Sequence, residues 1–373
     1  MVEFDEFGPE KIFEVYDAKT GMHGFTVIDN TALGPGKGGI RLTPTVTIDE
    51  VAKLARTMTW KCSVAGLPFG GGKSGIVADY RKISREQKHD IIKAFAIALR
   101  PICPRMYIAA PDINTAEEEM RVFVEANGSL KSATGKPANL CVSPGEKCGI
   151  PHEYGSTGFG VYHSTLIAAE HIGLNVKGAS VAIEGLGNVG SFAAKYLSQH
   201  GAKIVAVSDS KGCIYNEQGL DYKTLSKVKT ETGSVINYKP GNVLDTRKIF
   251  ELQVDILIPA AVPDVINKDN VNKVKAKIVV EASNIPTTAV IEEIMHRKGI
   301  LVVPDFVANA GGVISSYAEY RGKNPDDMFN MVEAKIKKNT RFVLEKAKAD
   351  KVKPRDAAME IAVKRVREAM KRG

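Results

Sequence analysis

Two lysines, Lys61 and Lys73, stand at the ends of the glycine-rich stretch KCSVAGLPFGGGKSG, residues 61–75. Glycines permit backbone conformations and close approaches that other residues forbid. A lysine at the end of such a stretch can be partly buried, and burial lowers its pKa towards the range of a catalytic base. Asp112, just after a short apolar segment, supplies a carboxylate for proton transfer. The alternatives are a solvated turn lysine and a turn or N-cap aspartate.

The end of this stretch, GGKSG, resembles the end of a phosphate-binding P-loop. A P-loop requires a glycine five positions before its last glycine, which here is Gly72. That position is occupied by Leu67, and Pro68 interrupts the loop. We therefore expect no nucleoside triphosphatase site.

A second glycine-rich motif, GLGNVG at residues 185–190, lies between an expected strand at 180–184 and an expected helix from about 189 to 200. This strand–turn–helix context is the one in which GxGxxG binds a dinucleotide. The glycines allow a tight turn and a close approach of the pyrophosphate to the positive N-terminus of the helix. The sequence predicts a Rossmann-like fold with cofactor contacts at Gly185, Gly187, Asn188, Val189 and Gly190.

The residues that follow the next expected strand, 203–208, bear on the choice between NAD and NADP. Asp209 lies about 20 residues after the last glycine of the motif, where an acid binds the adenosine ribose. An acid at that position repels a 2′-phosphate and favours NAD. Ser208, Ser210 and Lys211 could instead hold that phosphate. Both cofactors, NAD and NADP, stay open on these residues.

The whole chain, at 373 residues, exceeds the usual size of one domain, so two domains are expected. No apolar run has the length of a membrane span, and the acidic N-terminus lacks the basic and apolar regions of a signal peptide. These features predict a cytoplasmic protein without a membrane partner. The net charge is +8, but acids are interspersed among the lysines and arginines and no aromatic–basic module is visible. We therefore expect no nucleic-acid partner.

The five cysteines are scattered and form no CxxC pair. Neither a disulfide framework nor a metal site is indicated by such spacing. We expect reduced, mostly buried thiols at Cys62, Cys103, Cys141, Cys148 and Cys213.

Residues 1–147 are predicted to form one α/β domain that positions Lys61, Lys73 and Asp112. Apolar spacing and capping residues define its helices, and short apolar runs define its strands. The expected elements are a strand at 25–28, a loop at 30–39, a helix at 47–61, a glycine-rich loop, a strand at 75–78, a helix at 84–99 and a strand at 106–109. Capping boxes are expected at Thr47 with Glu50, Ser84 with Gln87, and Thr115 with Glu118.

Residues 148–353 are predicted to form the Rossmann-like NAD(P)-binding domain, a doubly wound α/β fold. The segment 132–156 is rich in Gly, Pro and Ser and is expected to be a loop or hinge between the domains. Further strands are expected at 255–258, 277–281 and 300–303, and Pro354 is expected to open the last helix.

The ordered motifs KGGIR, MTWKCSVAGLPFGGGKSG, APDINT, STGFG, GLGNVG, VVEASN and PDFVANAGGVISSY resemble those of the glutamate, leucine, phenylalanine and valine dehydrogenases. The resemblance runs over nearly the whole chain. It implies reversible oxidative deamination of an L-amino acid to a 2-oxo acid and ammonia, with NAD or NADP. It also implies an N-terminal substrate and assembly domain, against which the last helix, 354–373, packs.

The resemblance assigns roles position by position. Lys61 matches the lysine that binds the substrate α-carboxylate. Lys73 matches the catalytic lysine that activates water and stabilises the carbinolamine. Asp112 matches the acid that carries protons to and from the amino group. Contacts near the nicotinamide are implied at Thr157 and Asn309, and near the cofactor ribose at Asn284.

Two positions of the side-chain pocket favour L-glutamate as the substrate. In the glutamate branch of the family, the lysine before GG in KGGIR, here Lys37, pairs with the γ-carboxylate. A serine after ANAGG, here Ser316, also contacts that carboxylate, whereas leucine enzymes carry apolar residues at both positions. Gly38 and Val313 complete the expected substrate contacts. The alternative interpretations are an exposed loop lysine and a helix serine bonded to its own backbone.

Three points stay open on the sequence. The chain is short for the glutamate branch and closer in length to the leucine enzymes, so a branched-chain amino-acid dehydrogenase is the alternative within the family. A Rossmann-type binding protein without catalysis is the alternative outside enzymes. The resemblance implies a homo-oligomer, with a hexamer expected and an octamer as the other arrangement.

Overall fold

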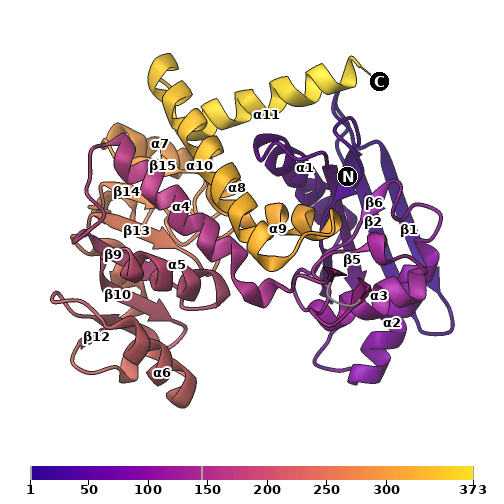
Figure 1. Ribbon diagram of the computed structural model, residues 1–373, viewed down its shortest axis with the longest axis horizontal. Helices are drawn as coiled ribbons and strands as arrows, with labels where there is room; N and C mark the ends of the chain where they lie inside the picture. Colours follow the sequence, from indigo (N-terminus) through magenta and orange to yellow (C-terminus); the bar gives the residue numbers. More distant parts are fainter. Residues whose placement is uncertain (1, 144–145, 373) are drawn as a thin grey trace. The chain divides into compact units, whose positions relative to one another are not determined.

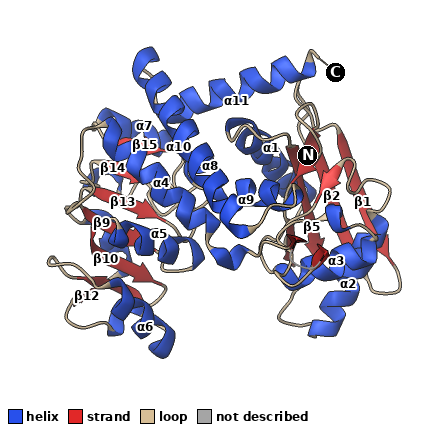
Figure 2. Ribbon diagram, in the orientation of Figure 1, coloured by secondary structure: helices blue, strands red, loops and turns tan. Residues whose placement is uncertain are grey.

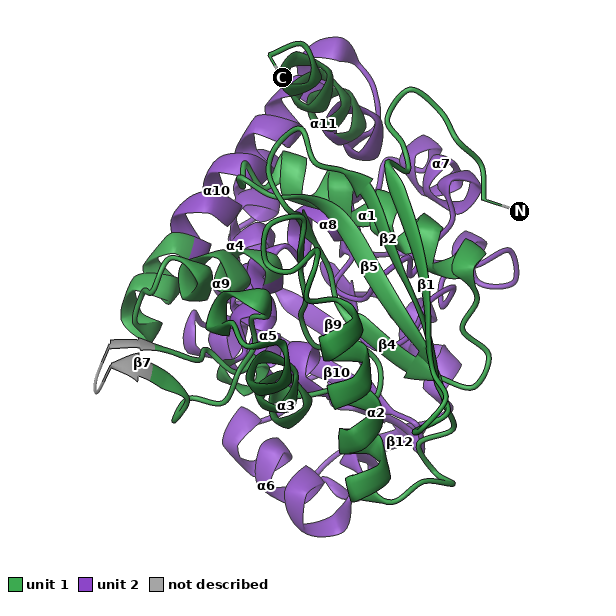
Figure 3. Cartoon of the chain, turned by 90° about the vertical axis from the view of Figure 1, so that its right-hand side faces the viewer, with its two compact units in different colours: residues 1–154, 313–331, 359–373 green, residues 155–312, 332–358 purple. Residues whose placement is uncertain are grey.

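The computed structural model describes residues 2–143 and 146–372. The chain divides into two compact units, coloured green and purple in Figure 3. Unit 1 comprises residues 1–154, 313–331 and 359–373, and unit 2 comprises residues 155–312 and 332–358. The chain therefore crosses between the units four times.

A six-stranded sheet forms the centre of unit 1 (Figure 2), in the order β1-β2-β5-β3-β6, with β4 paired to β5. Strands β1 and β2 are antiparallel to each other, as are β2 and β5, whereas β3 and β4 run parallel to β5, and β3 runs parallel to β6. The strands are β1 (Lys11–Asp17), β2 (Met22–Asn30), β3 (Gly36–Lys37), β4 (Ile40–Thr43), β5 (Gly70–Val77) and β6 (Tyr107–Ile108).

Helices cover both faces of this sheet. On one face, Val51 and Ala55 of α1 (Ile48–Val64) pack on Phe25 and Val27 of β2. On the other face, α2 (Arg85–Ala98) and α3 (Glu117–Asn127) lie side by side (Figure 1) and contribute Phe95 and other apolar residues to a larger buried cluster. Unit 1 also contains residues 313–320 of α9 (Gly311–Tyr320) and residues 359–370 of α11 (Pro354–Met370).

The glycine-rich stretch is a strand, so the prediction of a loop at Gly70–Gly72 is wrong. Strand β5 needs glycine because neighbouring backbone and side chains approach it closely. A Cβ on Gly71 would lie 2.0 Å from Thr59 Oγ1 and 2.4 Å from the Ala55 carbonyl oxygen of α1. Lys73 is therefore held in a buried central strand.

Three further strands account for the other errors in unit 1, and two of them, β3 and β4, are short. The sequence did not indicate β1, β3 or β4, and Lys37 lies in β3 instead of the predicted loop. The predicted strands at 25–28 and 106–109 are confirmed as β2 and β6.

The predicted capping boxes have three different outcomes. The box of Ser84 with Gln87 is confirmed at the start of α2. Thr47 caps α1, but the Glu50 carboxylate bonds to Arg41 instead of the Thr47 backbone. The box at Thr115 is wrong, because the Thr115 hydroxyl donates to the Ile40 carbonyl oxygen and α3 begins after Ala116.

A seven-stranded sheet forms unit 2, in the order β12-β11-β10-β9-β13-β14-β15. Five neighbouring strands run parallel: β10, β9, β13, β14 and β15. Strands β11 and β12 form an antiparallel edge next to β10, which the sequence did not indicate. The strands are β9 (Ser180–Glu184), β10 (Lys203–Asp209), β11 (Gly212–Tyr215), β12 (Asn242–Leu244), β13 (Ile256–Pro259), β14 (Ile278–Val280) and β15 (Leu301–Val303).

The predicted elements of this Rossmann-like fold are confirmed to within a few residues. The helix after GLGNVG begins at Asn188, and Pro354 opens α11. The helices are α4 (Ser156–His171), α5 (Asn188–Gln199), α6 (Tyr222–Thr232), α7 (Ala289–Arg297), α8 (Asp305–Ala308) and residues 332–350 of α10 (Pro325–Asp350).

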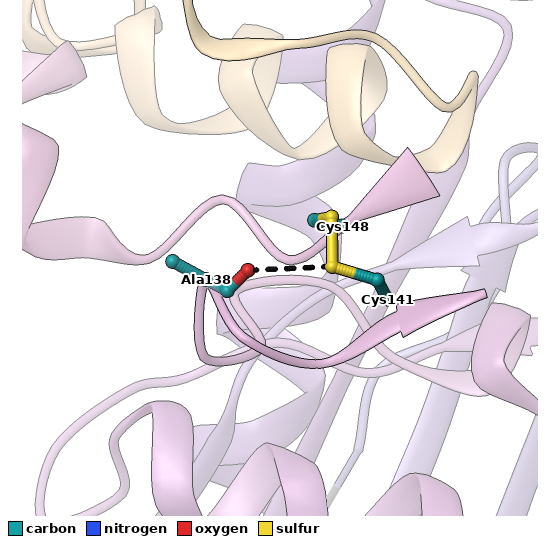
Figure 4. The surroundings of a disulfide bond; sticks show 3 residues. All are labelled: Ala138, Cys141 and Cys148. Atoms are coloured by element: carbon teal, nitrogen blue, oxygen red, sulfur yellow. Dashed lines mark hydrogen bonds between the residues drawn. A yellow bond between two sulfur atoms is a disulfide. The ribbon is translucent and has the colours of Figure 1, made fainter. Parts of the chain in front are cut away.

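The Gly, Pro and Ser-rich segment contains a short hairpin, β7 (Cys141–Ser143) with β8 (Glu146–Cys148). Cys141 and Cys148 face each other in its register, with Cα atoms 3.9 Å apart, and form a disulfide (Figure 4). The prediction of reduced thiols is therefore wrong for this pair. Cys62, Cys103 and Cys213 are free and buried, as expected.

Within the described ranges, no helix has the length and apolar composition of a transmembrane span.

Replacing Gly71 with alanine tests the packing of β5 against α1. Gly71→Ala is expected to lower the free energy of unfolding by about 3 kcal/mol, because the new methyl group overlaps the α1 backbone. The matched control is Gly128→Ala, where a Cβ meets nothing within 4 Å and only the positive φ of 87° opposes the change. That control should cost about 1 kcal/mol. Equal falls in thermal unfolding temperature for the two variants would contradict this packing.

Candidate active site

Lys73 and Asp112 form an ion pair in unit 1. Strand β5 carries Lys73, and the loop after β6 carries Asp112. Lys73 Nζ lies 2.5 Å from Asp112 Oδ2, and both side chains are largely shielded from solvent. The fold therefore brings together the two residues that were predicted to share proton transfers.

Arg41 is a member of this site that the sequence analysis missed. Its Nε lies 3.5 Å from Asp112 Oδ2, and its Nη1 donates to Glu50 Oε1 at 2.5 Å. Burial raises the pKa of Asp112, but the positive charges of Lys73 and Arg41 outweigh burial and leave that pKa below its ordinary value. Asp112 is therefore a carboxylate at neutral pH. The arginine of the KGGIR motif was the available signal.

Lys37 is one of the largest fully buried side chains of the protein. Its Nζ donates to the Ala109 carbonyl oxygen at 2.7 Å and lies 3.4 Å from that of Ile108. Burial lowers the pKa of Lys37 to about 7, because the ammonium form loses its hydration. Among the described residues Lys37 makes no ion pair with a carboxylate.

Gly38 lies in the short link between β3 and β4, where the backbone of the link approaches that of β5 closely. A Cβ on Gly38 would lie 1.7 Å from the Gly72 carbonyl oxygen. The Gly38 carbonyl oxygen accepts a hydrogen bond from the buried Tyr107 hydroxyl at 2.8 Å. Glycine is therefore required here by the backbone, and Tyr107 fixes the peptide beside Lys37.

Val313 and Ser316 lie on α9, and the side chains around them anchor this helix within unit 1. Phe69 makes edge contacts with Tyr317 and Tyr320, with ring centroids 5.7 and 5.5 Å apart. Val313 is buried and Ser316 is partly exposed. Lys61, in the last turn of α1, is also partly exposed and belongs to the same unit.

The GLGNVG motif has the features of a dinucleotide site in unit 2. Gly185 has a φ of 89°, and a Cβ on Gly190 would lie 1.9 Å from the Gly185 carbonyl oxygen. A Cβ on Gly187, in contrast, would meet nothing within 4 Å. The protein's own packing thus requires the outer two glycines, whereas Gly187 leaves open space at the N-terminus of α5. This fits a pyrophosphate approaching the backbone at the N-terminus of α5, where Asn188 and Val189 lie.

Asp209 lies at the end of β10, as predicted, but its carboxylate is already occupied. It accepts hydrogen bonds from Lys229 Nζ at 2.6 Å, the Val235 N–H at 2.8 Å, the Lys211 N–H at 2.9 Å and the Ser234 hydroxyl at 3.1 Å. Burial raises the pKa of Asp209, but these donors outweigh burial and lower it overall. The side chains of Ser210 and Lys211 are exposed beside it.

Asn309 connects the two segments that were predicted to hold the nicotinamide end of the cofactor. Its Nδ2 donates to the Ala282 and Ser283 carbonyl oxygens and to Asn284 Oδ1, at 3.2 to 3.3 Å. Its Oδ1 is buried and has no hydrogen-bond partner among the residues the structure describes. An amide donor of a bound ligand would satisfy that acceptor. Thr157, in the first turn of α4, is buried.

A buried charge cluster supports this end of the site. Arg355 lies 2.8 Å from Glu281, 2.7 Å from Glu292 and 3.1 Å from Asp305. Asp305 also accepts from the Ile285 N–H at 2.9 Å, which holds Ile285 at a φ of 50°. Burial and the neighbouring Glu292 raise the pKa of Glu281 above its ordinary value. No local pattern in the sequence indicates this cluster, because its members are up to 74 residues apart.

Within residues 2–143 and 146–372, no group of three His, Cys, Asp or Glu side chains is placed to hold a metal ion.

Comparison with known proteins gives matches to both units. Residues 9–127 match the family model described as Glu/Leu/Phe/Val dehydrogenase, dimerisation domain. Residues 148–373 match the model described as Glutamate/Leucine/Phenylalanine/Valine dehydrogenase.

Two relatives and one solved structure illustrate the similarity. The chain is 42% identical over 359 residues to the glutamate dehydrogenase of Aeropyrum pernix, covering 92% of this chain and 84% of the relative. It is 41% identical over 357 residues to the NADP-specific glutamate dehydrogenase of Saccharolobus shibatae, covering 92% and 83%. The crystal structure of the hetero-hexameric glutamate dehydrogenase from Thermus thermophilus, in its Leu-bound form, has a TM-score of 0.85 at 29% identity, covering 98% and 90%.

The family models and these relatives cover both the lysine–aspartate site and the dinucleotide motif. The chain belongs to the glutamate/leucine/phenylalanine/valine dehydrogenase family.

Proposed function

We propose that this protein is an NAD(P)-dependent glutamate dehydrogenase, which converts L-glutamate and water to 2-oxoglutarate and ammonia, reversibly. The observation that carries the proposal is Lys37, a buried lysine without a carboxylate partner in the described chain. A substrate γ-carboxylate would supply that partner. A leucine side chain would leave a buried polar group uncompensated, at a cost of several kcal/mol. The 42% identical glutamate dehydrogenase of Aeropyrum pernix supports the same substrate.

In this proposal three side chains carry the chemistry. Lys61 binds the substrate α-carboxylate. Lys73 directs water to the α-carbon and stabilises the carbinolamine, and Asp112 carries protons to and from the amino group. The 2.5 Å contact between Lys73 and Asp112 supports this division, because it lets a proton pass between acid and base.

The bound nicotinamide cofactor accepts a hydride from the substrate α-carbon. Its pyrophosphate is proposed to lie at the N-terminus of α5, with Thr157, Asn284 and Asn309 at the nicotinamide end. We further propose that NADP is preferred. The Asp209 carboxylate is occupied by Lys229 and by backbone donors, so it is poorly placed to bind ribose hydroxyls, while Ser210 and Lys211 are exposed for a 2′-phosphate. The NADP-specific relative from Saccharolobus shibatae supports this preference.

We also propose a cytoplasmic homo-oligomer, a hexamer. The hexamer is supported by the similarity to the hetero-hexameric enzyme of Thermus thermophilus.

The test of this function follows the loss of NADPH or NADH absorbance with ammonia and either 2-oxoglutarate or 2-oxoisocaproate. We expect turnover of 2-oxoglutarate, faster with NADPH. Turnover of 2-oxoisocaproate alone would instead support the branched-chain alternative. Turnover of neither oxo acid would support a binding protein without catalysis.

Lys73→Ala is expected to lower kcat by at least about 1,000-fold, because it removes the group that activates water. Binding of NADPH, followed by its fluorescence, should stay within about twofold, since Lys73 belongs to unit 1 and the dinucleotide motif to unit 2. The control Lys82→Ala removes a lysine whose side chain is 82% exposed and should leave kcat unchanged. Turnover retained by Lys73→Ala would rule out the assigned role.

Lys37→Leu is expected to lower kcat/KM for 2-oxoglutarate by roughly 100-fold or more, because the γ-carboxylate loses its charged partner. The ratio of 2-oxoisocaproate to 2-oxoglutarate activity should rise by a similar factor. Lys19→Leu, at an exposed turn position, is the control and should leave both values unchanged. An unchanged substrate ratio in Lys37→Leu would mean that Lys37 does not face the substrate side chain.

A further inference from the structure

Two buried charged residues of unit 1, Lys136 and Glu319, have no part in the chemistry proposed above. Their side chains are 8% and 1% exposed and form an ion pair. Glu319 Oε2 also accepts from the Gly135 N–H at 2.6 Å, and Lys136 Nζ donates to the Ala133 carbonyl oxygen at 2.7 Å. Glu319 follows Ser316 by three positions on α9, so the two residues share one face of that helix.

The backbone connects this ion pair to Lys37. The Ala109 carbonyl oxygen accepts from Lys37 Nζ at 2.7 Å and from the Thr134 N–H at 3.0 Å. Ala109 also pairs with Ala133, whose carbonyl oxygen holds Lys136. Lys37 and Lys136 are thus fixed by two neighbouring segments that pair with each other. We refer to Lys37, Lys136 and Glu319 together as the buried charge triad.

The titratable groups that act on Lys37 come from several elements. Burial lowers its pKa most, and the negative charge of Glu319 opposes that effect. Cys62 of α1 also acts to raise the pKa of Lys37, although burial raises the thiol's own pKa to about 12 and keeps it neutral. Lys136 and Lys73 act to lower the pKa of Lys37. The positive charge of Lys73 is paired with Asp112. When Lys37 is protonated, the triad therefore has two positive charges against one negative charge.

We propose that this buried charge triad selects dicarboxylic substrates, because its one excess positive charge is neutralised only by the distal carboxylate of the substrate. Glu319 is then a positioning residue for specificity: it anchors α9, which carries Ser316, and it keeps Lys37 able to hold a proton in a buried site. The inference rests on the proposed function, since it takes Lys37 as the partner of the γ-carboxylate. It adds two residues, Lys136 and Glu319, that determine how strongly Lys37 binds that group.

A monocarboxylic oxo acid such as 2-oxoisocaproate leaves the excess charge buried and uncompensated, and such a charge is costly in an apolar site. With 2-oxoglutarate the four groups sum to zero. Burial lowers the pKa of free Lys37 far below its ordinary value, because the ammonium form loses its hydration. Binding of the distal carboxylate favours the ammonium form and is therefore expected to draw in protons near neutral pH.

The test titrates 2-oxoglutarate into the enzyme–NADPH complex without ammonia, by calorimetry in two buffers of different ionisation enthalpy. This gives both the dissociation constant, Kd, and the number of protons taken up. For Glu319→Gln we expect more proton uptake at pH 7 than in the wild type, because loss of the negative charge lowers the pKa of Lys37 further. Its Kd should rise about 10-fold at pH 8.5 for each pKa unit lost, and much less at pH 5.5.

The matched control is Glu119→Gln. Glu119 also accepts from a backbone N–H, that of Ala116 at 2.7 Å, and pairs with a lysine, Lys88 at 2.6 Å. Glu119 is not among the groups with the largest effects on the pKa of Lys37, which are Glu319, Cys62, Lys136 and Lys73. This variant should match the wild type in Kd and proton uptake at every pH.

Lys136→Met provides a second variant with the opposite sign. It leaves Lys37 and Glu319 as a neutral pair, so Lys37 is protonated before binding. Proton uptake at pH 7 should fall towards zero, and binding of 2-oxoglutarate should weaken at every pH.

Two outcomes would overturn the inference. The first is a Kd for Glu319→Gln that changes by the same factor at pH 5.5 and 8.5, which a purely structural role predicts. The second is proton uptake that is the same in the wild type, Glu319→Gln and Lys136→Met. If the wild type turns over 2-oxoglutarate, either result removes only the selectivity mechanism. If the wild type does not turn over 2-oxoglutarate, the proposed function itself fails, independently of the variants.

Discussion

Contact between the backbones of Gly38 and Gly72 determines the geometry of the substrate unit. A Cβ on Gly38 would lie 1.7 Å from the Gly72 carbonyl oxygen, so only a glycine at this position lets the link between β3 and β4 lie against β5. Lys37 precedes one of these glycines and Lys73 follows the other. After this link, Ile40 pairs with Pro111, the residue before Asp112. The relative positions of the two lysines and the aspartate thus depend on the absence of a side chain at Gly38.

The helices and strands of unit 2 could be predicted from the sequence more completely than those of unit 1, for physical reasons. In unit 2 the five parallel strands are short apolar runs, and the glycine turn and the capping residues beside them are local signals. The antiparallel edge strands β11 and β12 lack such a pattern and were not predicted. In unit 1, β5 contains three consecutive glycines, which resemble a loop in composition although the strand is buried on both faces. Strand β3 has only two residues, too few for any periodic pattern.

The site residues divide in the same way. Lys73, Asp112 and the GLGNVG motif lie in recognisable local contexts, so they were found. Asp209 was placed correctly at the end of β10, but its hydrogen bonds to Lys229 and Ser234 come from 20 and 25 residues away. The Lys136–Glu319 pair is 183 residues apart and carries no local signal at all. Contacts of that kind depend on the assembled fold.

The buried charge cluster of unit 2 and the buried charge triad of unit 1 differ in the sign of their excess charge. Around Arg355, three carboxylates meet one guanidinium, and the pKa values of Glu281 and Glu292 are raised, so the cluster can reduce its negative charge by holding protons. Around Lys37 the imbalance is positive, and it lies at the position proposed for the substrate. The first cluster fixes the loop that carries Asn284 through its contact with Ile285. In our proposal the substrate carboxylate balances the charge of the second cluster.

The chain passes four times from one unit to the other, so unit 1 can be completed only after unit 2 has been synthesised. The Ser63 hydroxyl of α1 donates to the Ala362 carbonyl oxygen of α11, and Arg365 donates to the Ser63 carbonyl oxygen, about 300 residues later in the chain. At typical translation rates those partners leave the ribosome some 15 to 60 s after α1. The end of α1 must therefore stay without these partners while unit 2 is made. In a nascent chain of this architecture, the end of α1 is open to chaperones and proteases until α11 has been synthesised.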